Sequence, residues 1–175
     1  ERRRGDRRLE SFLGDGTQPL ADDVLANGLV AVTSPGRLQV LATEPSVIVD
    51  AAHNPHGARA LAATLLGSFA FDSITAIVGV LDDKDARGII EALDPVVTRF
   101  VVTRSDSERA LDVDVLAEIA TAVAGPDRVR IEPELAVALA EARDEAGPGD
   151  AVLVTGSITL VGQAMLMSAQ EDGES

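Results

Sequence analysis

The stretch SVIVDAAHNPHGARALAATLLGS, residues 46–68, contains the transition that decides the fold. Its first part, 46–50, is a short apolar run ending in Asp50, as expected for a strand buried on both faces. Apolar residues then recur at helical spacing through 55–68. Pro55 suits the first helical position, and Asn54 suits the N-cap. The stretch therefore predicts a strand that leads directly into a helix.

The sequence on either side continues this alternation. We predict strands at 37–43, 73–81, 99–104, 128–131 and 150–156, and helices at 86–94, 112–124, 133–146 and from about 158 onward. Apolar runs separated by helical patterns of about 10–15 residues indicate βαβ units and a mostly parallel sheet. A short turn at Glu44-Pro45 joins 37–43 to 46–50, so we expect one antiparallel strand. The predicted fold class is α/β.

Residues 1–35 differ from the rest, because five arginines crowd into the first eight positions. We predict helices at 7–14 and 21–32, and a type II turn at Ser34-Pro35-Gly36 that marks a domain boundary. Residues 171–175 form a solvated tail. The chain begins with Glu rather than Met, which together with the arginines leads us to expect a fragment or a processed product.

Composition disfavours several classes of function. The 175 residues carry a net charge of −14, from 15 basic and 29 acidic side chains, which argues against nucleic acid and anionic membranes as partners. The sequence has no cysteine, no signal peptide and no apolar run near the roughly 18 residues that span a bilayer, so we expect a cytoplasmic protein. It also lacks a phosphate loop, a dinucleotide fingerprint and a metal-ligand spacing, which disfavours a self-contained nucleotide hydrolase or dehydrogenase.

The richest candidate loop is 50–57, because ligands of open α/β sheets bind beyond the carboxyl ends of the strands. Asp50 ends the predicted strand, and His53 lies at the mouth of a helix N-terminus, where N–H groups and the dipole favour an anion. The simpler alternative is that Asp50 and Asn54 only end the strand and cap the helix. We expect His56, in the first helical turn, to be exposed and without a role.

A second candidate loop is Thr155-Gly156-Ser157. Gly156 permits close approach of the backbone, and Ser157 either faces the same edge as His53 or simply caps the last helix. Arg37 leaves the turn at the domain boundary, where its guanidinium could bind a phosphate or a carboxylate. Most surface arginines have no such role.

The loop at 79–85 contains Lys84, the one lysine of the chain. Asp83 or Asp85 could cap the following helix. A solvated charge cluster is the simpler interpretation of this loop.

Taken together, these motifs resemble those of the folylpolyglutamate synthase / dihydrofolate synthase family. In chain order they are Ser34-Pro35-Gly36-Arg37-Leu38, Asp50-Ala51-Ala52-His53-Asn54-Pro55, Gly79-Val80-Leu81 with Asp83-Lys84-Asp85, and Thr155-Gly156-Ser157. The resemblance extends from about residue 9 to about 167. Mur ligases share the domain and a similar A-H-N-P motif, but the P-G-R-L lead-in points to the folate branch.

The resemblance implies a three-layer, Rossmann-like domain with a six-stranded, mostly parallel sheet, at residues 36–170, and the end of a preceding ATPase domain with a linker at 1–35. It implies ATP-driven amide formation, in which a pteroate or folate carboxylate becomes an acyl phosphate that L-glutamate attacks. ATP and Mg²⁺ are the implied cofactors, with the phosphate loop and the Mg²⁺ ligands in an ATPase domain that this sequence lacks. Without it, we expect the chain alone to be inactive.

By resemblance, Arg37 and Asp50 contact ATP, while His53 and Ser157 are catalytic and lie near glutamate and the phosphates. Weaker candidates carried over in the same way are Asn54, Asp83, Lys84, Thr155 and Gly156, and no metal ligand is expected. The implied partners are ATP, L-glutamate, a pteroate or folate and the ATPase domain, in a monomeric enzyme. The alternatives are a Mur-type peptidoglycan ligase domain, and a stand-alone binding domain or remnant without catalysis.

Overall fold

A computed structural model describes residues 37–173, with side chains to residue 171. The helices predicted at 7–14 and 21–32, the turn at 34–36 and the domain boundary lie outside the described residues. None of the described helices is long and apolar enough to cross a membrane.

The described elements follow the predicted order. They are β1 (Gln39–Thr43), β2 (Ser46–Asp50), α2 (Pro55–Ser68), β3 (Ser73–Val78), α3 (Ala86–Leu93), β4 (Arg99–Val102), α4 (Val113–Ala124), a 3₁₀ turn η1 (Pro126–Arg128), β5 (Val129–Ile131), α5 (Leu135–Glu145), β6 (Asp150–Thr155) and α6 (Ile158–Gly173). β3 and β4 end earlier than predicted, at Val78 and Val102, because the apolar run continues into the loops at the sheet edge. The 3₁₀ turn was not predicted.

The strands form one six-stranded sheet in the order β1-β2-β6-β3-β4-β5. β1 pairs with β2 antiparallel, and all other neighbours pair parallel, as predicted. β6, the last strand in sequence, lies between β2 and β3 and pairs with both along its whole length. The carboxyl ends of these three strands therefore lie side by side.

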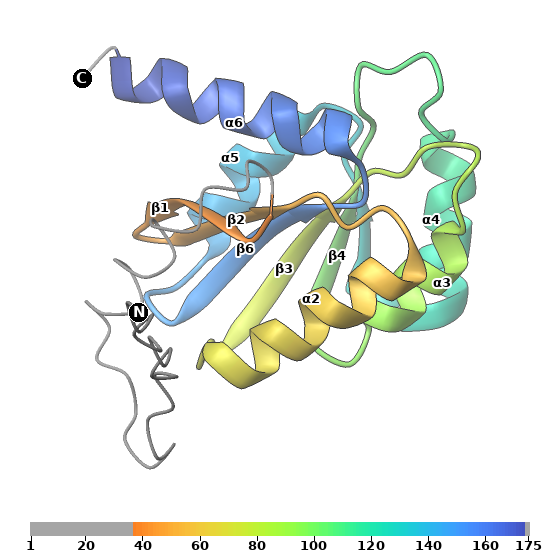
Figure 1. Ribbon diagram of the computed structural model, residues 1–175, viewed down its shortest axis with the longest axis horizontal. Helices are drawn as coiled ribbons and strands as arrows, with labels where there is room; N and C mark the ends of the chain where they lie inside the picture. Colours follow the sequence, from red (N-terminus) through yellow and green to blue (C-terminus); the bar gives the residue numbers. More distant parts are fainter. Residues whose placement is uncertain (1–36, 174–175) are drawn as a thin grey trace, which may run out of the picture.

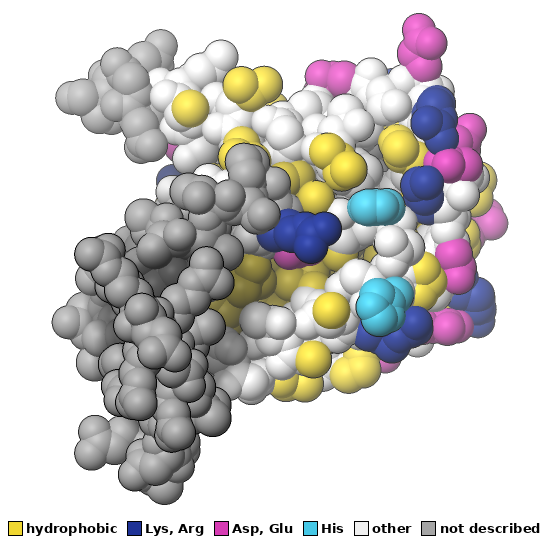
Figure 2. Space-filling model, in the orientation of Figure 1, with side chains coloured by type: hydrophobic (Ala, Val, Ile, Leu, Met, Phe, Trp, Pro, Cys, Tyr) yellow, Lys and Arg dark blue, Asp and Glu magenta, His cyan; other side chains and the backbone are white. Residues whose placement is uncertain are grey.

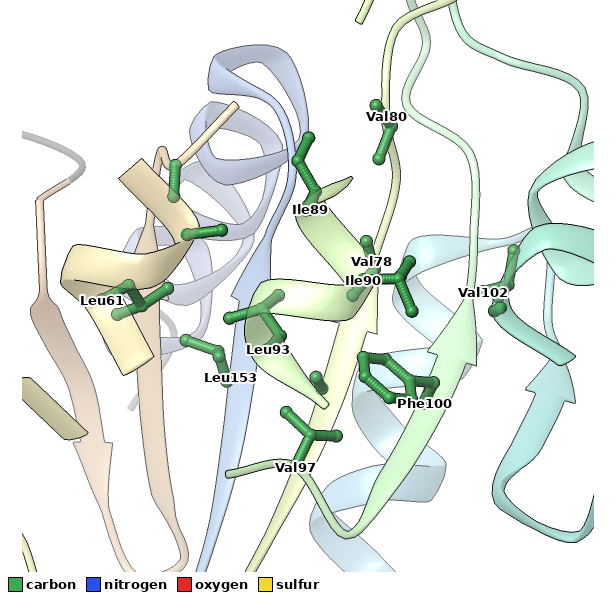
Figure 3. Close-up of a cluster of buried hydrophobic side chains, with 14 of the residues drawn as sticks. Leu61, Val78, Val80, Ile89, Ile90, Leu93, Val97, Phe100, Val102 and Leu153 are labelled. Atoms are coloured by element: carbon green, nitrogen blue, oxygen red, sulfur yellow. The ribbon is translucent and has the colours of Figure 1, made fainter. Parts of the chain in front are cut away.

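Helices cover both faces of the sheet, which gives the three layers visible in Figure 1. α2, α3 and α4 pack on one face over a core that includes Leu61, Leu93 and Phe100, shown in Figure 3. α5 and α6 pack on the other face over a second core around Val152 and Val154. Alternate residues of β6 contribute to the two cores, since successive side chains of a strand point to opposite faces.

The order in which the strands follow one another along the sheet reverses between β2 and β6, although the two strands run parallel. From β2 the chain crosses over α2 to β3 on one face, and α5 returns it to β6 on the other. α2 and α6 consequently begin at the same edge of the sheet but on opposite faces (Figure 1). Such a reversal is where open α/β sheets bind their ligands.

A groove of about 1060 Å³ lies elsewhere, between the β1–β2 hairpin, α5 and α6. Its apolar floor includes Leu41, Leu139 and Met167, and Arg143 and Glu171 form an ion pair of 2.8 Å at its edge. None of the predicted site residues lines this groove.

Candidate active site

Asp50 ends β2 and is fixed by the backbone on both sides. Its Oδ2 accepts a hydrogen bond of 2.8 Å from the Leu38 N–H, and its Oδ1 accepts one of 2.8 Å from the Ala52 N–H. Leu38 has φ 39°, a left-handed conformation that is uncommon for a side-chain-bearing residue. The carboxylate thus ties the start of β1 to the loop after β2, a contact that sequence reasoning missed.

Burial raises the pKa of the Asp50 carboxyl, and the N–H donors of Leu38 and Ala52 and the charge of Arg37 only partly oppose this effect. Arg37 is exposed. Its charge acts on Asp50, so the two residues predicted to contact ATP lie on the same part of the surface.

His53 follows in the loop and is half-buried. Its Nδ1 lies 2.9 Å from the Ala51 carbonyl oxygen. Because a carbonyl oxygen only accepts, Nδ1 carries a proton, and Nε2 is the ring atom left for a ligand. Asn54 is the N-cap of α2, since its Oδ1 accepts a bond of 2.8 Å from the Gly57 N–H, and Pro55 opens the helix as predicted.

His56 is exposed, as expected. Figure 2 shows the two histidine side chains of the chain at the surface of the same face.

Thr155 ends β6, and Gly156 and Ser157 form the loop that follows; all three residues are fully buried. Ser157 caps α6, because its Oγ accepts a bond of 3.1 Å from the Leu160 N–H. Gly156 has φ 106°, and a Cβ at this position would lie 2.7 Å from the Gly79 carbonyl oxygen. Only glycine allows this close approach without strain.

The loop after β3 carries the predicted charge cluster. Asp83 forms ion pairs with Lys84 at 3.0 Å and with Arg109 at 2.7 Å. All three side chains are partly exposed to solvent. The hydrogen bond from Lys84 is the main cause of the lowered pKa of Asp83. Asp85 caps α3, with its Oδ1 2.8 Å from the Gly88 nitrogen. Arg109 had not been singled out, since it lies far along the chain.

Backbone hydrogen bonds join these loops into one surface. The Gly156 N–H donates to the Ala52 carbonyl at 3.1 Å, and the Gly79 N–H donates to the Thr155 carbonyl at 3.3 Å. The loop of His53 and the loop of Ser157 are therefore direct neighbours.

Two helices of more than ten residues, α2 and α6, begin at this surface, and the positive end of each helix dipole attracts anions. The arrangement can hold carboxylates or phosphates. The described residues contain no group of three or more His, Cys, Asp or Glu side chains that could hold a metal ion.

The Mur ligase, glutamate ligase domain family matches residues 36–158. The chain belongs to this family. The dihydrofolate synthase/folylpolyglutamate synthase of Mycobacterium tuberculosis is 42% identical over 177 residues, which cover 93% of this chain and 36% of that protein. The chain therefore spans about a third of the length of this relative.

Solved structures show the same fold. Folylpolyglutamate synthase of Mycobacterium tuberculosis complexed with ADP is similar with a TM-score of 0.73 and 44% identity, over 79% of this chain and 33% of that chain. A bifunctional folylpolyglutamate synthase/dihydrofolate synthase with Mn, AMPPNP and L-glutamate bound gives a TM-score of 0.69 at 32% identity, over 86% and 36%. The predicted family and fold class are confirmed.

Proposed function

We propose that this chain is the C-terminal domain of an ATP-dependent amide ligase that adds L-glutamate to dihydropteroate or to folates. The observation that carries the proposal is the shared edge, where the Gly156–Ala52 hydrogen bond holds the α2 and α6 N-termini next to each other. A ligase of this kind must hold several anions at once: nucleotide phosphates, an acyl phosphate and the carboxylates of glutamate. Two adjoining helix N-termini and a histidine suit that task.

The proposed roles follow the placement of the side chains. Arg37 and Asp50 contact ATP, with the guanidinium near the phosphates. His53, through Nε2, and the α6 N-terminus capped by Ser157 bind glutamate and the phosphates near the reacting atoms. Because the Ser157 side chain is 1% exposed and already caps the helix, it acts by shaping the N-terminus. Asn54 and Gly156 support the two loops in the same way.

The reaction is the transfer of a phosphoryl group from ATP to the pteroate or folate carboxylate, followed by attack of the glutamate amine on the acyl phosphate. An amide forms, and ADP and phosphate leave. The contribution of this domain is to align the amine and to neutralise charge. Mg²⁺ would neutralise the charge of the transferring phosphoryl group. We assign its ligands to an ATPase domain, because the described residues contain no group of three or more His, Cys, Asp or Glu side chains that could hold a metal ion.

The ATPase domain is the proposed partner, in a monomeric cytoplasmic enzyme. The printed sequence contains no G-x-x-x-x-G-K-[ST] loop, so the chain alone should not ligate glutamate. The relatives at 42% and 44% identity are folate ligases, and no observation favours a peptidoglycan substrate.

The test is a chimera in which residues 37–175 replace the corresponding domain of the Mycobacterium tuberculosis enzyme. We expect ADP release that requires both a folate or pteroate substrate and L-glutamate, and none from the chain alone. The control is the same chimera with its phosphate-loop lysine replaced by alanine. A folded chimera that releases no ADP with any pteroate or folate would contradict the proposed function and favour a non-catalytic binding domain.

A further inference from the structure

The hydroxyl of Thr155 has an unusual environment. Thr155 is 0% exposed, and its Oγ1 has no hydrogen-bond partner among the described residues. Two other buried hydroxyls at this edge, those of Thr103 and Ser157, are bonded. The Thr103 hydroxyl donates to the Pro133 carbonyl at 3.0 Å, and the Ser157 hydroxyl caps α6. The Thr155 hydroxyl therefore differs from those of Thr103 and Ser157, because it is fully buried and has no partner among the described residues.

The direction of the Thr155 side chain follows from strand alternation. Leu153, two residues earlier in β6, belongs to the core under α2 and α3, so Thr155 points to that face. Ile48 belongs to the same core, so Asp50, two residues later in β2, points there as well. Asp50 and Thr155 are direct partners in the parallel register of β2 and β6. Their side chains are thus neighbours across about 4.8 Å, the usual spacing of strands.

The Asp50 carboxylate has room for a further donor. A carboxylate offers about four acceptor positions, and the Leu38 and Ala52 N–H groups use two of them. One of these donors, Leu38, directly follows Arg37, at the end of the described chain where the nucleotide is proposed to bind. A ligand that moved Leu38 would break the bond from its N–H to the Asp50 carboxylate, which could then accept a hydrogen bond from another donor.

A buried hydroxyl without a partner destabilises a protein, and valine would fill the same space in a central strand without that cost. Departures from complete hydrogen bonding of buried polar groups are found most often at functional sites. We propose that Thr155 is a positioning residue of the ligase, whose hydroxyl donates a hydrogen bond to the Asp50 carboxylate when ATP is bound. The inference rests on the proposed function.

Electrostatics supports this assignment. Burial already raises the pKa of Asp50, so the ionised carboxylate is poorly stabilised in the free protein. A hydroxyl donor would favour the ionised form when the nucleotide is present. Loss of the hydroxyl should therefore matter most at low pH.

The first test is thermal unfolding of the 175-residue chain. Thr155→Val should leave Tm unchanged or raise it, because no hydrogen bond is lost. The matched control, Thr103→Val, removes a bond to Pro133 and should lower Tm by several degrees. If Thr155→Val lowered Tm as much as Thr103→Val, the hydroxyl would be bonded in the free protein and the proposal would be wrong.

The second test is steady-state kinetics of the chimera. Thr155→Val should raise the KM for ATP about tenfold, as for loss of one hydrogen bond to a charged group. The KM for glutamate should stay unchanged. The acidic limb of kcat, which reports the ATP-bound enzyme, should move to higher pH, and Thr155→Ser should restore both values.

The two proposals can fail separately. An active chimera in which Thr155→Val leaves the KM for ATP and the pH profile unchanged would overturn this inference while the proposed function stands. A chimera without ligation would refute the proposed function, and this inference with it.

Discussion

Asp50 and Asp150 illustrate at the residue scale how surroundings set the behaviour of one side-chain type. Burial raises the pKa of Asp50 above the ordinary value of 3.8. The Ser73 hydroxyl, at 2.7 Å, and the Gly147 N–H lower the pKa of Asp150 below it. Because Asp50 lies at the edge that carries the candidate site and Asp150 at the other end of the sheet, only Asp50 is a candidate for function.

These shifts have opposite consequences for stability. A raised pKa means that the folded protein binds the proton more tightly, so the contribution of Asp50 grows as pH falls through its raised pKa and is lost as pH rises. A lowered pKa means the reverse, so the contribution of Asp150 is lost as pH falls below 3.8 through its lowered pKa.

We predict that urea unfolding of wild type, Asp50→Asn and Asp150→Asn at a series of pH values will show this difference. As pH falls, the free energy of unfolding of wild type should increase relative to that of Asp50→Asn. It should decrease relative to that of Asp150→Asn. If both differences moved in the same direction, the Asp50 carboxyl would be solvated in solution, and burial would not raise its pKa.

At the scale of elements, the β6–α6 junction depends on a single glycine. Gly156 adopts φ 106°, and its backbone passes close to the Gly79 carbonyl. The same residue donates to Ala52 and so joins the two loops of the site. The junction has no space for a side chain.

Gly156→Ala should therefore destabilise the domain, by about 1–3 kcal/mol for the backbone strain alone. Gly67→Ala is the matched control, because Gly67 lies in α2 with nothing within 4 Å of its Cβ position. That substitution should stabilise by up to about 1 kcal/mol, as alanine does in a helix. Chemical denaturation of both variants measures the contrast, and equal effects would mean that the junction relaxes easily.

Most elements could be predicted from the sequence because their signals are local. Pro55 and Asn54 act within a few residues, and the bounds of α2 agree with the prediction. The insertion of β6 between β2 and β3 could not be predicted, since it depends on contacts such as Ser73–Asp150, which are 77 residues apart. The Leu38–Asp50 bond and the unpaired Thr155 hydroxyl depend equally on distant residues, so sequence motifs predicted a candidate site but not its internal bonding.

At the scale of the whole molecule, β6 connects the two cores. Leu153 belongs to one core, and Val152 and Val154 belong to the other, all of them fully buried. Neither helical layer can therefore lose its packing without disturbing the sheet that supports the second layer.

We predict one cooperative unfolding transition for the described domain in the 175-residue chain. Far-ultraviolet circular dichroism and hydrogen exchange across both layers should give the same midpoint. Leu153→Ala should lower the free energy of unfolding by about 2–5 kcal/mol and keep a single transition. Separate midpoints for the layers would contradict the account of β6.

The central claim is that the edge formed by the loops after β2 and β6 binds glutamate, and kinetics of the chimera with His53→Ala tests it most directly. Loss of the contact through Nε2 should lower kcat/KM for L-glutamate about 10- to 150-fold, the equivalent of about 1.5–3 kcal/mol. His56→Ala, which removes an exposed histidine from the same helix start, should change it less than about twofold, as expected for a surface substitution. If His53→Ala used glutamate as well as His56→Ala does, the edge would not be the glutamate site.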